Sequence, residues 1–265
     1  MRLLIDAGNT RIKWALADEV AQLAQVTDEC WLFHGDLPTL QASQLSQEIA
    51  GRLARRNTGE NLHDIKQIWV SNVAGEEIAH RIRSMASGLA VPVNFAGARQ
   101  AQCGVRNGYA SISQLGSDRW ASLISAWHMV KGKCLVVNSG TATTIDSLSG
   151  QGEFVGGLIL PGVDLMQRSL VEATDQLKSS QGEYVPFPLN TADAIYSGAI
   201  QAICGAIERQ YILLDDADAP VVLSGGDAAL LKPYLDQNQS MARLLVVDNL
   251  VLRGLLVMAQ EDNFR

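Results

Sequence analysis

Residues 3–13 read LLIDAGNTRIK, and residues 135–145 read LVVNSGTATTI. Each stretch is an aliphatic run, a polar turn that contains a glycine, and a second apolar run, which is the pattern of a strand–turn–strand unit. Aligning them places Gly8 opposite Gly140 and Asp6 opposite Asn138, 132 positions further along a chain of 265 residues. Because glycine lets backbone N–H groups approach phosphate oxygens closely, one such hairpin in each half predicts two facing domains with a polyanion between their turns.

The composition is that of an ordinary soluble globular protein, with 47% hydrophobic and 18% charged residues. A net charge of −7 argues against a nucleic-acid partner, which requires clustered Lys and Arg. The one basic cluster, at residues 52–56, is interpreted as the solvated face of a helix. No apolar run reaches the roughly 18 residues of a membrane span, and the polar break after residue 5 comes too early for a signal peptide. We therefore expect no nucleic-acid partner and no membrane.

The four cysteines stand at positions 30, 103, 134 and 204, and none forms a CxxC pair. No histidine is spaced to complete a zinc site with them. Cys134 and Cys204 lie in apolar runs and are expected in the core. This usage predicts a cytoplasmic protein with reduced thiols.

The order of predicted elements is that of a mixed α/β protein, in which hairpins lead into helices. Residues 97–117 are predicted to form a linker or a substrate loop, residues 178–190 a loop, and Thr191 the N-cap of a long helix that carries a stripe of small residues. Strands are expected at 3–6, 12–16, 67–72, 92–95, 134–148 (the second hairpin), 154–160, 221–223 and 244–247, and helices at 40–53, 76–86, 117–130, 163–177, 191–213 and the C-terminus.

The first hairpin turn carries Asp6, Gly8, Asn9 and Thr10, with Lys13 three residues further on. A carboxylate beside glycine and a hydroxyl suits a Mg²⁺–phosphate group, because Mg²⁺ prefers carboxylate and phosphate oxygens. Lys13 can reach a phosphate as a point charge. The alternative is an ordinary turn in which Asp6 and Asn9 bond only the backbone.

The second turn, at residues 140–144 with Asp146 after it, offers small and hydroxyl side chains for the other side of a triphosphate. A run of threonines also occurs simply because threonine favours strands. Paired glycines in the stretch 224–227 would let a flat adenine ring lie against the backbone, although such a pair is common in turns.

The stretch 115–119, LGSDR, opens a helix rich in tryptophan. Asp118 falls in the first helical turn, where the helix dipole favours the ionised carboxylate, and it can then accept a proton from a substrate hydroxyl. Arg119 offers a fork of donors to a substrate carboxylate. A helix cap and a surface ion pair are the alternative interpretation.

These motifs occur together and in one order along nearly the whole chain, with the weakest match between residues 20 and 65. In this combination the chain closely resembles the type III pantothenate kinases of the actin/hexokinase-like ATPase superfamily. The motifs are DAGNTRIKW (6–14), NGY (107–109), LGSDRW (115–120), SGTATTID (139–146), GGLILPG (156–162), NTADAIYSGAI (190–200) and LSGGDA (223–228).

The resemblance implies an α/β fold with two ribonuclease-H-like, actin-like ATPase domains, which we expect at 1–115 and 116–265, with mixed sheets flanked by helices. It implies a cytoplasmic, ATP-binding transferase that moves the γ-phosphoryl group of ATP to the terminal hydroxyl of pantothenate. The product, 4′-phosphopantothenate, opens coenzyme A biosynthesis. The expected cofactors are Mg²⁺ with ATP and a monovalent cation, K⁺ or NH₄⁺. The expected assembly is a homodimer, in which each substrate pocket borrows residues from the partner.

The resemblance also assigns roles to individual residues. Asp118 corresponds to the proton acceptor, Asp6 lies near Mg²⁺, and Asn138 falls at the monovalent-cation site. The ATP phosphates are expected at Asp6, Ala7, Gly8, Asn9, Thr10, Arg11, Ile12, Lys13 and Thr141. Pantothenate is expected at Tyr109, Gly116, Ser117, Asp118, Arg119 and, from the other protomer, Thr191.

Two positions depart from the family pattern. The family usually has aspartate at the place of Asn138, so the cation site here keeps an oxygen ligand but loses a charge. The loop before Gly116 usually carries a proline where this chain has Ile112, and a less rigid loop would raise the ordering cost of substrate binding.

Two alternatives to a pantothenate kinase remain open at this stage. An enzyme on the same fold could phosphorylate another small hydroxy acid, because a fold does not determine a substrate. A catalytically weak accessory or regulatory protein is the second alternative, and Asn138 is the one feature that favours it. The presence of Asp6, Lys13, Asp118 and Arg119 argues against such a loss of activity.

Overall fold

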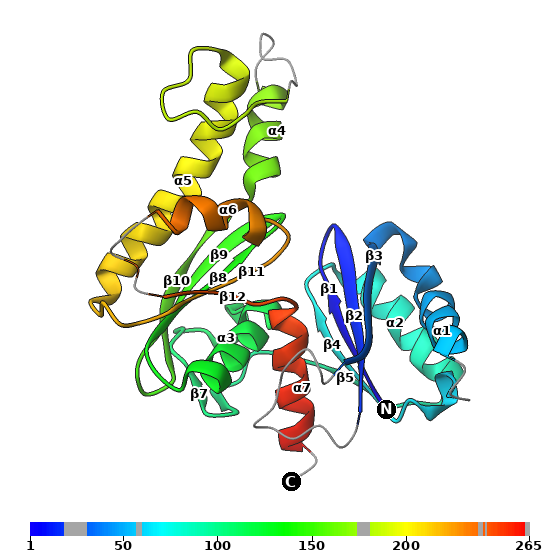
Figure 1. Cartoon of the computed structure of the whole chain (residues 1–265). Coiled ribbons are helices and arrows are strands. Elements are labelled where there is room, and N and C mark those ends of the chain that lie inside the picture. Colours follow the sequence, from blue (N-terminus) through cyan, green and yellow to red (C-terminus); the bar gives the residue numbers. More distant parts are fainter. Residues whose placement is uncertain (19–30, 57–59, 174–180, 238–240, 242, 263–265) are drawn as a thin grey trace. The chain divides into compact units, whose positions relative to one another are not determined.

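The computed structural model describes residues 1–18, 31–56, 60–173, 181–237, 241 and 243–262 (Figure 1). The chain forms two compact units. Unit 1 comprises Met1–Met129 and Asn249–Arg265, and unit 2 comprises Val130–Asp248. Compact units defined by internal contacts need not coincide with ribonuclease-H-like domains, so the expected domain boundary between residues 115 and 116 stays a prediction.

Unit 1 is built on a five-stranded mixed sheet in the order β3-β2-β1-β4-β5. The first hairpin forms as predicted, with β1 and β2 antiparallel, and β1 pairs in parallel with β4 on its other side. The strands are β1 (Arg2–Ala7), β2 (Arg11–Ala17), β3 (Trp31–Pro38), β4 (Gln67–Asn72) and β5 (Val93–Phe95), and a short antiparallel pair follows at β6 (Ala101–Gln102) and β7 (Val105–Asn107).

Alternate residues of β1 point to opposite faces of this sheet. Leu3 and Ile5 belong to a fully buried core with residues of helices α1 (Leu45–Arg56) and α2 (Glu76–Leu89), which lie together on one face (Figure 1). Helix α7 (Leu250–Asp262) packs against β1, β2 and β4. At Gly254 of α7 any side chain would overlap the carbonyl of Ala121, so the glycine permits close contact with α3 (Ser117–Val130).

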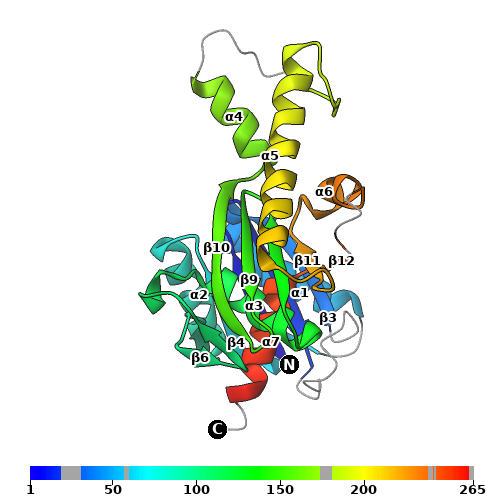
Figure 2. The same cartoon turned by 90° about the vertical axis from the view of Figure 1, so that its left-hand side faces the viewer.

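Within unit 2 the strands follow the order β12-β11-β8-β9-β10. Helix α5 (Thr191–Leu214) packs against β8 and β9, and α4 (Val163–Ala173) lies beside α5 (Figure 2). The second predicted hairpin is β8 (Cys134–Ser139) and β9 (Ala142–Leu148), followed by β10 (Glu153–Pro161), β11 (Val221–Ser224), helix α6 (Ala228–Leu235) and β12 (Leu244–Val246).

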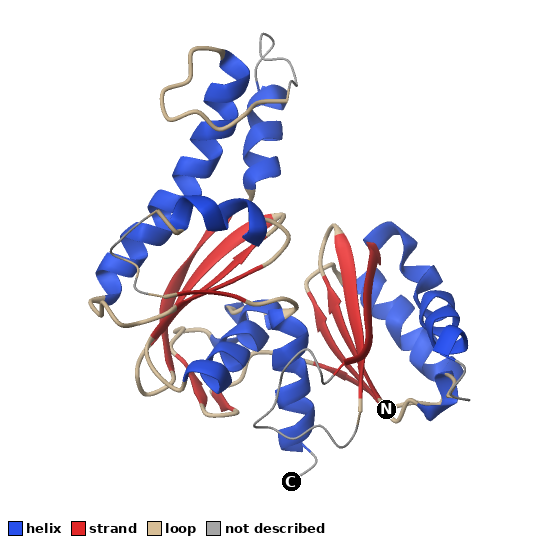
Figure 3. Ribbon diagram, viewed as in Figure 1, coloured by secondary structure: helices blue, strands red, loops and turns tan. Residues whose placement is uncertain are grey.

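Most predicted elements are present, and the differences have local causes (Figure 3). Strand β3 and helix α6 were not predicted, and the stretch 97–117 contains β6, β7 and a 3-10 turn at Ile112–Gln114. The predicted helix at 40–53 begins as a 3-10 turn, Thr39–Gln44, before α1. The predicted helical residues 174–177 lie outside the described residues.

The predicted N-cap at Thr191 is wrong by one residue. Asn190 has extended backbone angles, and its side-chain oxygen accepts a hydrogen bond from the Asp193 N–H at 3.0 Å, so Asn190 caps the helix. Asparagine is at least as good an N-cap as threonine, and Thr191 becomes the first helical residue.

Cys134 and Cys204 are buried, as predicted, and Cys103 is buried as well. All three carry free thiols, whereas Cys30 lies outside the described residues. Across the described part of the chain, the helices are too short or too polar to span a membrane.

Candidate active site

The β1–β2 turn projects the first motif from the end of the unit 1 sheet. The Gly8 N–H donates to the Arg11 carbonyl at 3.0 Å, and Asn9 and Thr10 are exposed at the tip. Thr39 anchors the turn from outside, because its hydroxyl donates to the Gly8 carbonyl at 2.7 Å and its N–H donates to the Thr10 carbonyl at 3.0 Å. The turn therefore has a fixed backbone and an exposed polar rim, which suits phosphate binding.

Arg11 is also on this turn, and its side chain forms an ion pair with Asp36 of β3. Both side chains are about half exposed, so the pair contributes little to stability. The ion pair occupies the Arg11 guanidinium, whereas Asn9 and Thr10 stay exposed at the tip of the turn.

Asp6 and Lys13 face each other across β1 and β2, in one register pair. Burial raises the pKa of the Asp6 carboxyl to about 7, the charge of Asp118 adds to the increase, and Lys13 opposes it. A carboxylate with a raised pKa is one that a bound cation would stabilise, because the cation compensates the charge that burial penalises. Asp6 thus fits a magnesium ion that takes most of its other ligands from nucleotide phosphates and water.

In the described residues, no group of three or more His, Cys, Asp or Glu side chains forms a metal site.

Asp118 lies in the first turn of α3, and its conformation is fixed by its own helix. Its carboxylate accepts a hydrogen bond from the Arg119 N–H at 2.8 Å, and its carbonyl accepts one from the Ser122 hydroxyl at 2.8 Å. Gly116 leaves room for this carboxylate, because a Cβ at residue 116 would lie 2.5 Å from the Asp118 carboxylate oxygen. Asp118 remains half-buried, so its carboxylate is accessible to a substrate.

Arg119 is only 4% exposed and contacts Tyr109 in the preceding loop. Its guanidinium donates to the Tyr109 hydroxyl at 2.9 Å and lies 5.6 Å from the centre of the tyrosine ring. The Tyr109 N–H in turn donates to the Asn107 side chain at 3.0 Å. Tyr109 and Arg119, both predicted to contact the substrate, are therefore one connected group, and the guanidinium is held in place before any substrate arrives.

Unit 2 carries the second motif at the β8–β9 turn. The Gly140 N–H donates to the Ala142 carbonyl at 3.0 Å, and Thr141 is exposed. Two other motif glycines pack against this turn, because a side chain at Gly162 would overlap the Gly140 carbonyl and one at Gly225 would overlap the Ser139 carbonyl. The motifs SGTATTID, GGLILPG and LSGGDA thus meet at one place.

A hydroxyl and carboxylate network lies beneath this turn. The Ser139 hydroxyl is 2.8 Å from the Thr143 hydroxyl and donates to Asp227 at 3.3 Å, while the Asp227 N–H donates to the Ser139 carbonyl at 3.1 Å. Burial raises the pKa of Asp227, and the Ser139 hydrogen bond partly offsets this. The sequence motifs included these residues, but nothing in their spacing indicated that they bond one another.

Asn138 is the residue before the last one of β8, and it is half-buried, in register with Thr144 of β9. The side chain at this position is an amide, so the site offers a neutral oxygen to a cation. Asp146, two residues beyond Thr144 in β9, is fully buried. It is therefore a residue of the interior, and it does not lie on the exposed rim beside Thr141.

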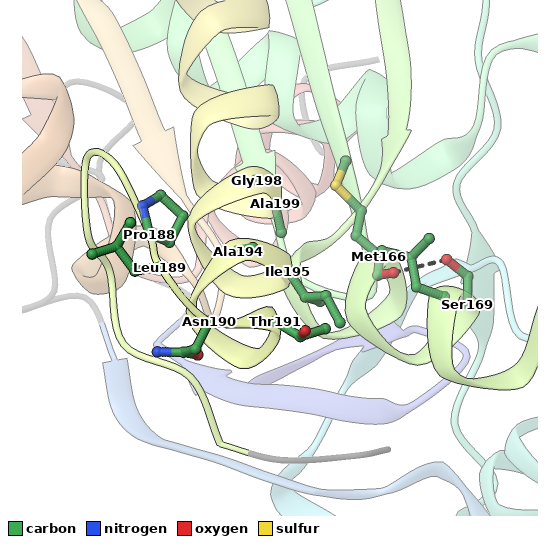
Figure 4. Close-up of a pocket in the computed structure, with 11 residues that line it drawn as sticks. Met166, Ser169, Pro188, Leu189, Asn190, Thr191, Ala194, Ile195, Gly198 and Ala199 are labelled. Carbon is green, nitrogen blue, oxygen red and sulfur yellow. Dashed lines mark hydrogen bonds between the residues drawn. The ribbon is translucent and has the colours of Figure 1, made fainter. Parts of the chain in front are cut away.

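Thr191, the last predicted substrate residue, lies in a groove of 780 Å³ on unit 2 (Figure 4). The groove runs between the start of α5 and the residues of α4 around Met166 and Leu170. Its floor includes the small residues Ala194 and Gly198. Thr191 is exposed there, with no other predicted site residue in the groove.

The structure thus groups the predicted residues by unit. Asp6, Lys13, Asp118, Arg119 and Tyr109 belong to unit 1, whereas Thr141, Asn138 and Thr191 belong to unit 2. The sequence interpretation missed Thr39, which anchors the first turn, because a single threonine outside a motif carries no recognisable signal.

The site has the features of a phosphoryl-transfer enzyme, because each unit presents a glycine-bearing turn and unit 1 adds carboxylates and a lysine. Comparison with known proteins gives the family. The family model described as type III pantothenate kinase matches residues 2–212. The chain belongs to the type III pantothenate kinase family.

Curated relatives match over nearly the full length. A type III pantothenate kinase from Nitrosospira multiformis is 41% identical over 264 residues, covering 98% of this chain and 92% of that protein. One from Aromatoleum aromaticum is 42% identical over 263 residues, covering 99% of each chain.

Solved structures support the fold. The ethanolamine utilization protein EutJ from Carboxydothermus hydrogenoformans aligns with a TM-score of 0.56 at 14% identity, covering 97% of this chain and 88% of that one. A polyphosphate/ATP-glucomannokinase from Arthrobacter sp. strain KM aligns with a TM-score of 0.50 at 13% identity, covering 98% of each. At such identities the likeness establishes the α/β fold alone.

Proposed function

We propose that this chain is an ATP-dependent pantothenate kinase, which transfers the γ-phosphoryl group of ATP to the terminal hydroxyl of pantothenate. The product is 4′-phosphopantothenate, and the reaction is the first step of coenzyme A biosynthesis. The full-length match to type III pantothenate kinases carries this assignment. The cluster of Asp6, Lys13, Asp118 and Arg119 in unit 1 supports it, because it supplies the charges that phosphoryl transfer requires.

In this mechanism the chain positions reactants and stabilises charge. The backbone of the β1–β2 turn and Lys13 bind ATP phosphates, and Thr141 contacts them from the second turn. Mg²⁺, when bound beside Asp6, neutralises charge on the phosphates. Asp118 accepts the proton of the substrate hydroxyl as that oxygen attacks phosphorus. Arg119, already oriented by Tyr109, binds the pantothenate carboxylate through its fork of donors.

The monovalent cation, K⁺ or NH₄⁺, binds at Asn138 in this proposal. An amide oxygen is a weaker ligand for a cation than a carboxylate, because it carries no net charge. We therefore expect activation at higher cation concentration than an aspartate at this position would require.

The protein acts as a homodimer in the cytoplasm under this proposal. Apolar side chains are exposed around the α4–α5 groove, with Phe187 87% exposed and Leu189 99% exposed. A stripe of exposed small residues on α5 would let a second copy approach closely: Ala194, Gly198, Ala202 and Gly205. Thr191 of the partner subunit then completes the substrate pocket. Free thiols at the described cysteines fit a reducing compartment.

A substrate panel tests the proposal. The purified chain is given Mg-ATP with pantothenate, or with other small hydroxy acids of similar length, and phosphorylated products are detected by mass spectrometry. We expect pantothenate to have the highest kcat/KM. A higher kcat/KM for another hydroxy acid would replace the substrate assignment while leaving the kinase assignment intact.

A further inference from the structure

A polar row crosses the unit 1 sheet at the level of Asp6. Asp6 on β1 is in register with Lys13 on one neighbouring strand and with Ser71 on the other. Directly opposed residues on adjacent strands point to the same face, so the Ser71 side chain lies on the Asp6 face of the sheet. Ser71 is fully buried, and it is the one polar residue among the four buried residues of β4.

The Ser71 hydroxyl has one identified partner, the hydroxyl of Ser117. The two oxygens are 2.9 Å apart and come from segments 46 residues apart in the sequence. Ser117 is the first residue of α3, and the next residue is Asp118. One hydrogen bond therefore connects the strand beside Asp6 to the start of the helix that carries the candidate base.

The segment before α3 contains the 3-10 turn Ile112–Gln114 and the buried Leu115, and then Gly116, which has no side chain to pack. The hydrogen bond at Ser117 ties the residue before Asp118 to β4, the strand that pairs with β1 beside Asp6. It therefore limits how far the start of α3 can move from Asp6.

We propose that Ser71 is a positioning residue for phosphoryl transfer, holding Asp118 at its working distance from Asp6 through the hydroxyl of Ser117. This inference rests on the role of Asp118 in the proposed function. Misplacing a catalytic group by about 1 Å can cost up to about 10²-fold in rate, so one buried hydrogen bond at this place affects turnover more than binding.

Steady-state kinetics of Ser71→Ala test the proposal. We expect kcat to fall about tenfold, equivalent to ~1.4 kcal/mol in the barrier, with the KM for ATP unchanged within about twofold. Ser125→Ala is the matched control, because Ser125 is a buried serine of α3, the helix that begins at Ser117, and its hydroxyl has no hydrogen-bond partner. The control should keep the wild-type kcat. Ser71→Cys preserves the side-chain size, and it should reproduce the loss if the alanine variant does not fold.

A double-mutant cycle with Ser117→Ala shows whether the two hydroxyls act as a pair. If they do, adding Ser71→Ala to Ser117→Ala lowers kcat by less than about twofold further. Additive losses, or a Ser71→Ala kcat equal to that of the Ser125→Ala control, would overturn the inference while the wild type still phosphorylates pantothenate. A wild-type protein that makes no phosphopantothenate would instead remove the proposed function, and this inference with it.

Discussion

At the scale of single residues, the candidate site depends on carboxylates in different surroundings. Asp118 sits at a helix start, and its carboxylate accepts a hydrogen bond from the next backbone N–H. At Asp6, burial and the Asp118 charge raise the pKa to about 7. Different environments for neighbouring carboxylates are what separate a proton acceptor from a cation ligand.

Replacing Asp118 with asparagine keeps the side-chain shape but removes the proton acceptor. We expect Asp118→Asn to lower kcat by about 10²-fold, the lower end of what a general base contributes. ATP binding should change little, and calorimetric titration with a non-hydrolysable ATP analogue measures it. Unchanged turnover would show that Asp118 is not the base.

The raised pKa of Asp6 predicts a pH-dependent stability. The folded chain holds a proton on Asp6 more tightly than the unfolded chain does. Below pH ~4 the carboxyl is protonated in both states and does not lower the free energy of unfolding. As the pH rises from there to about 7, ionisation of Asp6 lowers the free energy of unfolding progressively. Without ATP or Mg²⁺, Asp6→Asn should melt at least about 2–4 °C above the wild type at pH 8, and the gap should narrow at pH 5. Glu172→Gln, at an exposed position on α4, serves as the control and should show no such pH-dependent gap.

The proposed cation site at Asn138 gives a prediction about the K⁺ requirement. Asn138→Asp introduces a charged ligand, so we expect the K⁺ concentration for half-maximal activity to fall several-fold. An unchanged concentration would mean that the cation does not bind at residue 138.

At the scale of elements, the hairpins could be predicted because each joins two apolar runs through a glycine-bearing turn. The long helices could be predicted because their apolar residues recur at helical spacing. Strand β3 escaped prediction because its apolar and polar residues do not alternate, and only Leu37 is buried among its residues 31–38. The contacts that support the site were also missed. Ser71 and Thr39 act across segments far apart in the sequence, and no local pattern marks such a pairing.

The start of α3 gives a prediction at this scale. In Gly116→Ala the new Cβ would lie 2.5 Å from the Asp118 carboxylate oxygen, and the end of that side chain can turn away without disturbing the backbone. We therefore expect a normal melting temperature and a kcat lowered by about 10²-fold. Gly88→Ala on α2 is the control, because an added Cβ there meets nothing within 4 Å. A Gly116→Ala variant with full activity would show that the position of Asp118 is not critical.

At the scale of the whole molecule, the repeated hairpin was the correct guide, since it placed one glycine-bearing turn in each compact unit. The family resemblance then gave the activity class, which composition and periodicity alone leave open. The residue roles remain predictions that follow from the family motifs and from the geometry around Asp6 and Asp118.

The proposed homodimer predicts the effect of a charge on the exposed stripe of small residues on α5. Gly198→Glu should yield a monomer in light scattering and reduce activity, because Thr191 of the partner subunit no longer reaches the substrate. The fold should survive, since an added Cβ at Gly198 meets nothing within 4 Å. Gly88→Glu, equally exposed and equally open on α2, should remain dimeric. A dimeric Gly198→Glu variant would place the interface elsewhere.

The most direct measurement is the detection of 4′-phosphopantothenate after incubation of the purified chain with Mg-ATP and pantothenate, with and without K⁺ or NH₄⁺. We expect the product to form in amounts equal to the ADP released, and to increase with the cation. A folded protein that binds ATP yet forms no phosphopantothenate under any of these conditions would contradict the assignment of this chain as a pantothenate kinase.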